Sequence, residues 1–261
     1  MKLDIYQVDA FADKVFEGNP AAIIPLTEWL PDEKLQAIAA ENNLAETAYF
    51  LPTTNGFHLR WFTPTVEVPL CGHATLASAF IIYSELGYDK DEIVFKTQSG
   101  PLVVRKKDDG FAMDFPANPP TPCDIPKGLD EAIGAKLIEA HENRFCLVVC
   151  ESEEEVRNAK PDFKALGNIT PGDFILTAKS EKYDFVSRCF APTHGIDEDP
   201  VTGSAHCVAA PFWAERLGKT ELLARQVSSR GGNVLCSVKE DRVELFGRAI
   251  LYLKGEITLT P

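Results

Sequence analysis

The chain has 261 residues and a formal net charge of −13 at pH 7. This length suffices for one large domain or two moderate ones, each with a sizeable core. Because acidic residues outnumber basic ones in both halves, the composition argues against nucleic acid and anionic membranes as partners. No stretch is apolar for the roughly 18 residues that a membrane-spanning helix requires.

The seven cysteines are odd in number and mostly lie within apolar runs, which is not the pattern of a disulfide framework. They contain no Cys-x-x-Cys pair, so no metal site is expected. The N-terminal residues lack the apolar segment of a secretory signal peptide. Together these features predict a cytoplasmic protein.

The first half shows the pattern of a sheet interrupted by two helices. Strands are expected at residues 3–8, 21–24, 46–51, 58–62, 93–95, 102–104 and 111–115. One helix follows Pro31, and a second runs from about Gly72 to Leu86 and ends before Gly87. The second helix contains the run ATLASAFII, which is apolar on every side, so we expect this helix to be buried all round.

A proline-rich linker at residues 116–126 leads to the second half. Here helices are expected at about 129–140, 153–166 and 203–217, and strands at 145–150, 174–178, 185–190, 234–238, 243–245, 249–253 and 256–259. The sequence therefore predicts two domains, residues 1–115 and 116–261. The last strand is a candidate to return to the first domain, because chain ends often lie together.

The two halves repeat one another. The pattern Arg-x-Phe-x-Pro begins at Arg60 and again at Arg188, and further along Gly72 aligns with Gly203, each at the start of an apolar helix. Strand, turn and helix signals recur in one order across most of each half, which indicates an old duplication. We predict an α+β fold of two pseudo-symmetric domains, each a barrel-like, mostly antiparallel sheet wrapped around a central apolar helix.

In such an arrangement the N-termini of both apolar helices are expected to face a cleft between the domains. The free N–H groups and partial positive charge of a helix N-terminus bind carboxylate or phosphate groups. Glycine lets a ligand approach the backbone closely, although a single glycine before a helix is also explained by steric permission alone. The duplicated context of Gly72 and Gly203 favours substrate binding at both positions.

Five segments carry a resemblance to a known family: DAF at 9–11, GNP at 18–20, NLAETA at 43–48, PLCGHAT at 69–75 and EDPVTGSAH at 198–206. They resemble the phenazine-biosynthesis isomerase-like (PhzF) family, which shares the two-domain fold of diaminopimelate epimerase. The resemblance covers essentially the full length. It implies a cofactor-independent isomerase that moves a proton on a small carboxylate-bearing substrate bound between the domains. It does not imply the phenazine precursor itself as that substrate.

The resemblance also implies roles for four side chains. Glu46, within NLAETA, matches the acid/base glutamate of the family, and His73 matches its cleft histidine. Asp199 and Ser204 match the polar pair of the second domain, where Asp199 is expected to assist catalysis and Ser204 to bind substrate. Each residue also has a structural alternative: a solvated carboxylate for Glu46 and a core histidine for His73. In the structural alternative Asp199 only stabilises a turn, and Ser204 only caps the helix that follows.

Cys71 supports a weaker alternative. In the related epimerases and proline racemases, two cysteines at the two helix N-termini act as paired bases. Here the counterpart of Cys71 in the repeat is Thr202, and Cys207 lies more than one helical turn further on, so a thiol-dependent racemase lacks its second thiol. A non-catalytic protein that binds or senses a small metabolite is a further alternative. The oligomeric state is not determined by the sequence, and a homodimer is the base-rate expectation.

Overall fold

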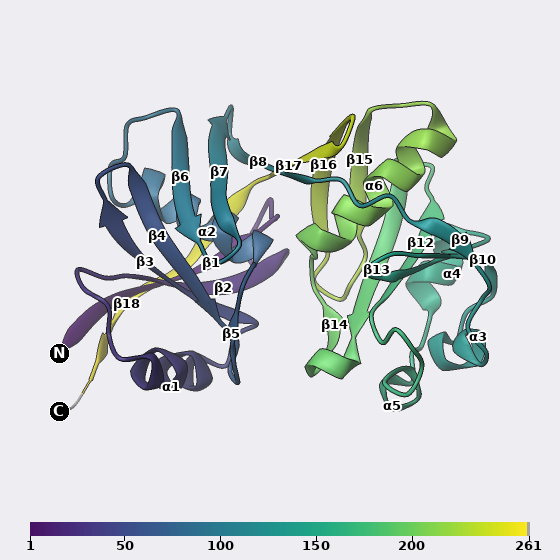
Figure 1. Ribbon diagram of the computed structural model, residues 1–261, viewed down its shortest axis with the longest axis horizontal. Coiled ribbons are helices and arrows are strands. Elements are labelled where there is room, and N and C mark those ends of the chain that lie inside the picture. The colour runs from purple at the N-terminus through teal and green to yellow at the C-terminus, as the bar shows by residue number, and fades with distance from the viewer. Residues whose placement is uncertain (260–261) are drawn as a thin grey trace. The chain divides into compact units, whose positions relative to one another are not determined.

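The computed structural model describes residues 1–259, which form eighteen strands and six α-helices and confirm the α+β class (Figure 1). The chain divides into two compact units. The first comprises residues 1–114 and the C-terminal segment that begins at Phe246, and the second comprises residues 115–245. The C-terminal segment belongs to the first unit because its strand pairs with the first strand of the chain along its whole length.

The first unit is a mostly antiparallel sheet with two helices. Its elements are β1 (Lys2–Ala10), β2 (Asn19–Pro25), α1 (Asp32–Asn42), β3 (Glu46–Thr53), β4 (Gly56–Phe62), β5 (Glu67–Val68), α2 (Gly72–Ser84), β6 (Glu92–Thr97), β7 (Gly100–Lys107), β8 (Gly110–Pro116) and β18 (Ala249–Thr258). The strands pair in the order β18–β1–β2–β3–β4–β6–β7–β8. The pairs β2–β3 and β4–β6 are parallel, and the other pairs in this series are antiparallel.

The second unit repeats this plan with more short helices. Its elements are β9 (Thr121–Cys123), α3 (Leu129–Ile133), β10 (Leu137–Glu142), β11 (Cys146–Cys150), α4 (Glu153–Asn158), α5 (Phe163–Leu166), β12 (Phe174–Lys179), β13 (Phe185–Ala191), the 3₁₀ turn η1 (Pro192–His194), β14 (Ile196–Asp199), α6 (Gly203–Leu217), β15 (Glu221–Gln226), β16 (Gly232–Lys239) and β17 (Arg242–Gly247). The series β10–β11–β12–β13–β15–β16 has its parallel pairs, β11–β12 and β13–β15, at the places that β2–β3 and β4–β6 occupy in the first unit. This shared topology is what the predicted duplication requires.

Helix α2 is buried on all sides, as its sequence predicts. Every residue from His73 to Ala79 is buried, and the helix packs against β1, β2, β3 and β18. The hydroxyls of Thr75 and Ser78, in its buried part, each donate to the backbone carbonyl four residues earlier. These bonds satisfy both hydroxyls within the helix, so that this part of the helix can occupy an apolar core.

Two predicted helices of the second unit are wrong. The helix expected at 129–140 ends at Ile133, because Gly134 adopts a left-handed conformation (φ 70°) and its N–H caps the carbonyl of Asp130. The residues that follow form β10, which gains backbone hydrogen bonds from β9 and β11 on its two sides.

The helix expected at 153–166 is interrupted because Pro161 lacks the N–H that a continuous helix needs at that point. Asp162 then caps a new helix, α5, by accepting a hydrogen bond from the N–H of Ala165. Strand β15 was not predicted. The strands predicted at 249–253 and 256–259 are one continuous strand, β18.

Gly18 occupies a position that only glycine fits. Its φ is 67°, and a Cβ atom there would lie 2.1 Å from the carbonyl oxygen of Ala10. Gly87 offers a matched control, because its φ is 69° but a Cβ atom would meet nothing within 4 Å. We expect Gly87→Ala to lower the free energy of unfolding by about 1 kcal/mol, the cost of the left-handed backbone. Gly18→Ala should cost about 1–3 kcal/mol more because the backbone must move.

Urea denaturation of the two glycine variants and the wild type measures this difference directly. Equal losses for Gly18→Ala and Gly87→Ala would show that the collision at Gly18 is relieved without cost.

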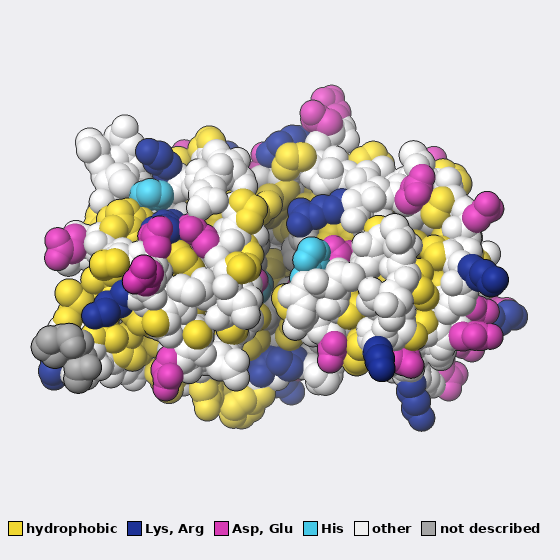
Figure 2. Space-filling view, turned by 60° about the horizontal axis from the view of Figure 1, so that its bottom comes forward, with side chains coloured by type: hydrophobic (Ala, Val, Ile, Leu, Met, Phe, Trp, Pro, Cys, Tyr) yellow, Lys and Arg dark blue, Asp and Glu magenta, His cyan; other side chains and the backbone are white. Residues whose placement is uncertain are grey.

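Charged side chains of both signs are interspersed on the face of the molecule in Figure 2, and on that face the Lys and Arg side chains do not gather into one basic patch. Among residues 1–259, no helix combines the length and apolar character needed to cross a bilayer.

Candidate active site

Glu46 is the first residue of β3, just after α1. The helix is followed by Asn43, whose left-handed backbone (φ 49°) turns the chain toward the sheet. Asparagine adopts this conformation more readily than most residues with a side chain. Glu46 then pairs with Ala21 of β2, and its side chain is only 12% exposed. It is therefore not the solvated edge carboxylate of the structural alternative.

Cys71 and His73 flank Gly72 at the N-terminus of α2. Cys71 is the N-cap residue and has an extended backbone (φ −145°), so it lies outside the helical spiral. Residues two apart within a helix do not face one another. The extended backbone of Cys71 instead lets its side chain contact the ring of His73, and both residues are buried.

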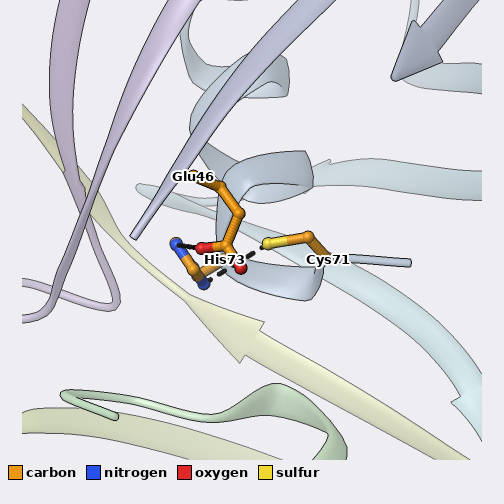
Figure 3. Close-up of side chains that lie close together, drawn as sticks. All are labelled: Glu46, Cys71 and His73. Carbon is orange, nitrogen blue, oxygen red and sulfur yellow. Dashed lines mark hydrogen bonds and ion pairs between the residues drawn. The ribbon is translucent and has the colours of Figure 1, made fainter. Parts of the chain in front are cut away.

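The imidazole ring of His73 contacts Glu46 through one nitrogen and Cys71 through the other (Figure 3). His73 Nε2 lies 3.1 Å from Glu46 Oε2, and His73 Nδ1 lies 3.5 Å from Cys71 Sγ. The Glu46–His73 contact is within ion-pair distance but lacks the angle of a hydrogen bond. Neither Glu46 Oε2 nor His73 Nε2 has a hydrogen-bond partner within residues 1–259. Both atoms thus retain hydrogen-bonding capacity for a further group.

The charge state of His73 is set by its neighbours. Burial alone disfavours a charged imidazole. The Cys71 sulfur beside one ring nitrogen and the Glu46 carboxylate beside the other outweigh burial and hold the pKa of His73 well above its ordinary value. His73 is therefore suited to carry a proton beside the Glu46 carboxylate. A proton shared by a buried carboxylate and imidazole is the arrangement that general acid–base catalysis uses.

The Cys71 thiol has the opposite tendency. Burial, followed by the charge of Glu46, raises the pKa of Cys71 to about 11. Because only the thiolate can accept a proton and little thiolate forms near neutral pH, Cys71 is poorly suited to act as a base. Thr202, its counterpart in the repeat, is the N-cap residue of α6. These observations disfavour the thiol-dependent racemase.

In the second unit, Asp199 is the last residue of β14, and its carboxylate accepts a hydrogen bond of 2.5 Å from the hydroxyl of Thr202. The first two residues of α6 follow: Gly203 is buried and Ser204 is half-buried. Ser204 lies inside the helix and Thr202 is the N-cap residue, so the alternative of Ser204 as the helix cap is wrong.

Gln226 is a polar residue of this group that the sequence analysis missed. Its amide accepts a hydrogen bond from the N–H of Thr202 (2.8 Å) and donates one to the carbonyl of Asp199 (2.6 Å). Gln226 therefore fixes the backbone that leads into α6. A signal was present, because Gln226 follows Leu222 and Ala224 on the buried face of β15.

Each helix N-terminus is preceded by a matching Arg–Glu pair. In the first unit Arg60 of β4 donates two hydrogen bonds of 2.7 Å to the two carboxylate oxygens of Glu67 in β5. In the second unit Arg188 of β13 donates to both oxygens of Glu198 in β14, at 2.7 and 2.9 Å. Bidentate pairs of this kind are strong and directional. They tie the short strand before α2 or α6 to the sheet.

The six predicted site residues fall in two groups of three. Glu46, Gly72 and His73 lie in the first unit, and Asp199, Gly203 and Ser204 lie in the second. The structure joins Glu46 and His73, and it adds Cys71 to them. It places Asp199, Gly203 and Ser204 at the N-terminus of α6, where Thr202 and Gln226 support them.

His206, one turn into α6, is buried and neutral. Its Nδ1–H donates to the carbonyl of Thr202 (2.8 Å), and burial lowers its pKa to about 4 despite this bond. Because the pKa in the folded state is below the ordinary value of 6.5, the unfolded chain binds the proton more tightly. The stability that neutral His206 contributes is thus complete above pH 6.5 and is lost as the pH falls toward 4.

We expect the wild type to lose about 2 kcal/mol more than His206→Asn when the pH is lowered from 7 to 5. Asparagine keeps a side-chain N–H donor but does not titrate. The free energies of unfolding in urea, measured for both proteins at both pH values, give this difference. A pH dependence that is the same in both proteins would show that His206 does not titrate as its burial requires.

Two similar units, each with a sheet packed against a buried helix whose N-terminus carries polar groups, define the epimerase-like class of α+β proteins. A hydroxyproline epimerase from Agrobacterium vitis has this fold: it is 9% identical, with a TM-score of 0.60, over 98% of this chain and 92% of its own. At this identity the likeness shows the fold alone. A sequence profile of phenazine biosynthesis-like proteins (PhzC-PhzF) matches residues 8–255, so the chain belongs to this family, as its motifs predict.

Closer relatives agree with this assignment. An uncharacterized isomerase from Pseudomonas aeruginosa is 50% identical over 99% of this chain and 100% of its own length. The crystal structure of a phenazine biosynthesis protein of the PhzF family from Enterococcus faecalis is 46% identical. It has a TM-score of 0.97 and covers 99% of this chain and all of its own.

Proposed function

We propose that the protein is a cofactor-independent isomerase that moves a proton on a small carboxylate-bearing substrate, with Glu46 as the general acid and base. The observation that carries this proposal is the buried pair of Glu46 and His73, whose facing atoms lie 3.1 Å apart and lack a hydrogen-bond partner among the described residues. A buried polar atom without a partner is costly, and a catalytic role is one reason for a protein to retain it.

The chemistry assigned to this pair is a proton transfer in two steps. The Glu46 carboxylate takes a proton from a carbon of the substrate and returns it to another carbon. Between the steps Glu46 is a neutral carboxylic acid. His73, which carries a proton beside Glu46, stabilises the carboxylate before the first step and after the second. Acid–base catalysis by a positioned side chain increases the reaction rate by about 10²- to 10⁴-fold. Glu46 and His73 supply the side chains that this catalysis needs.

Charged and polar groups of the substrate are assigned to the helix N-termini. Gly72 begins α2 and Gly203 begins α6. The first N–H groups of a helix have no carbonyl partner within the helix, which suits them to a carboxylate. In the second unit Asp199 and Ser204 are assigned to substrate contact. The names of the relatives support an isomerase in general, and the particular substrate is open to experiment.

The proposal is tested by incubating the protein with a panel of small unsaturated and α-substituted carboxylic acids in deuterated water. Mass spectrometry then measures deuterium incorporated at carbon. Catalysed exchange into one class of compounds supports the isomerase. Tight binding of a compound from the panel, without exchange or conversion, would instead favour a protein that binds the metabolite without turning it over.

A further inference from the structure

We propose that Glu46, Cys71 and His73 form a binding site for a divalent transition-metal ion of the zinc and cobalt type. Each residue offers one donor atom, and the carboxylate oxygen, thiol sulfur and ring nitrogen all lie within 4.8 Å of one another. This inference concerns metal binding and does not depend on the proposed isomerase activity.

The distances suit a tetrahedral ion. With a metal–sulfur bond of about 2.3 Å and a metal–nitrogen bond of about 2.0 Å, two ligands at the tetrahedral angle are about 3.5 Å apart. Cys71 Sγ and His73 Nδ1 are separated by 3.5 Å. The carboxylate of Glu46 faces the other ring nitrogen, Nε2, so it would have to rotate about its side-chain bonds to complete the third position. The fourth position is then open, as in metal sites with three protein ligands.

The surroundings of the cluster favour a cation. Glu46 and His73 are 9% and 5% exposed, and their facing atoms, Oε2 and Nε2, lack a hydrogen-bond partner within residues 1–259. A metal ion would give the Glu46 carboxylate a partner without water. At His73 it would bind Nδ1, the nitrogen that faces Cys71, and not Nε2. The donor set of one sulfur, one nitrogen and one oxygen selects for Zn²⁺ or Co²⁺ over Mg²⁺ and Ca²⁺, which take oxygen ligands.

The charges balance when the ion binds. Cys71 loses its thiol proton to solvent, and an imidazolium at His73 loses one as well, because a metal ligand must be deprotonated. One thiolate and one carboxylate then neutralise the two positive charges of the ion. Since the ion occupies the lone pairs of Glu46 and His73, we expect it to inhibit any proton transfer at this site.

The test uses the full chain, freed of metal with a chelator that is then removed, and titrated with Co²⁺. Coordination of Co²⁺ by a thiolate produces a charge-transfer absorption band in the near ultraviolet, whether or not the protein has activity. We expect the wild type to develop this band with one equivalent of Co²⁺. Cys71→Ala should abolish it, and His73→Asn should weaken Co²⁺ binding at least tenfold.

The matched control is Cys123→Ser, because Cys123 is a half-buried cysteine of the second unit outside the cluster. This variant should keep the band and the affinity of the wild type. A wild type without the band would overturn the proposal, as would an unchanged band in Cys71→Ala or its loss in Cys123→Ser. Circular dichroism establishes that each variant is folded. Should Cys71→Ala fail to fold, loss of the band in Glu46→Gln and His73→Asn supports the site, and its retention in both overturns it.

Discussion

Replacing Glu46 with glutamine is expected to slow deuterium exchange into the substrate by about 10²- to 10⁴-fold, the contribution of a positioned general acid and base. Glutamine has the same shape as glutamate and can still contact His73, which lies 3.1 Å from the carboxylate. It cannot take a proton from carbon at neutral pH. The measurement is the rate of deuterium incorporation into a compound that the wild type exchanges, with a chelator present to keep metal from the site.

The control for this variant is Glu139→Gln. Glu139 also forms a Glu–His pair, because its carboxylate lies 3.4 Å from Nε2 of His141, but it belongs to β10 of the second unit and contacts Arg216 as well. We expect this variant to exchange substrate hydrogen at the rate of the wild type. Wild-type exchange by Glu46→Gln, with the fold intact by circular dichroism, would remove Glu46 from the mechanism.

Arg188→Ala is expected to lower the free energy of unfolding by about 3–5 kcal/mol, because it leaves the paired Glu198 without its counter-charge in a largely buried site. The side chains of Arg188 and Glu198 are 10% and 19% exposed. Arg188 also donates to the backbone carbonyls of Val156 and Ala159 at the end of α4, and the substitution would leave both carbonyls without this donor. Urea denaturation, followed by circular dichroism, measures the loss.

The matched control is Arg157→Ala, which removes an exposed i,i+4 pair with Glu153 on the surface of α4. Exposed pairs of this kind contribute roughly 0.2–1 kcal/mol. A double-mutant cycle of Arg188→Ala with Glu198→Gln then isolates the energy of the buried pair. A cost for Arg188→Ala no larger than that for Arg157→Ala would mean that the bidentate pair does not stabilise the second unit.

The most predictable part of the fold was the pair of central helices. Both α2 and α6 begin at a glycine and contain apolar residues on every side, a pattern that suits a helix enclosed by a sheet. The helix at 203–217 was predicted to the residue, and the duplication followed from the signals around these helices. The family could also be predicted from the sequence, since each motif that resembles it is a short continuous segment.

Less predictable were the features that depend on contacts between distant residues. Leu137–Glu142 has a composition compatible with a helix, and it becomes strand β10 because β9 and β11 supply hydrogen-bond partners on both sides. The contact between Cys71 and His73 was missed for a different reason. Two residues that are two positions apart in a helix point away from each other, so the spacing of Cys71 and His73 suggests no contact. Cys71, however, has an extended backbone and lies before the helix begins.

The pairing of β18 with β1 affects the order in which the chain assembles during translation. The pairing runs from Lys2 with Thr258 to Ala10 with Ala249, so β1 can complete this pairing only after residues 249–258 have left the ribosome. The second unit is continuous in sequence and is complete once Leu245 has emerged. Because domains tend to fold as units during synthesis, we expect the first unit to complete its sheet after the second unit has folded. Until then β1 has an exposed edge that a chaperone or a neighbouring chain can pair with.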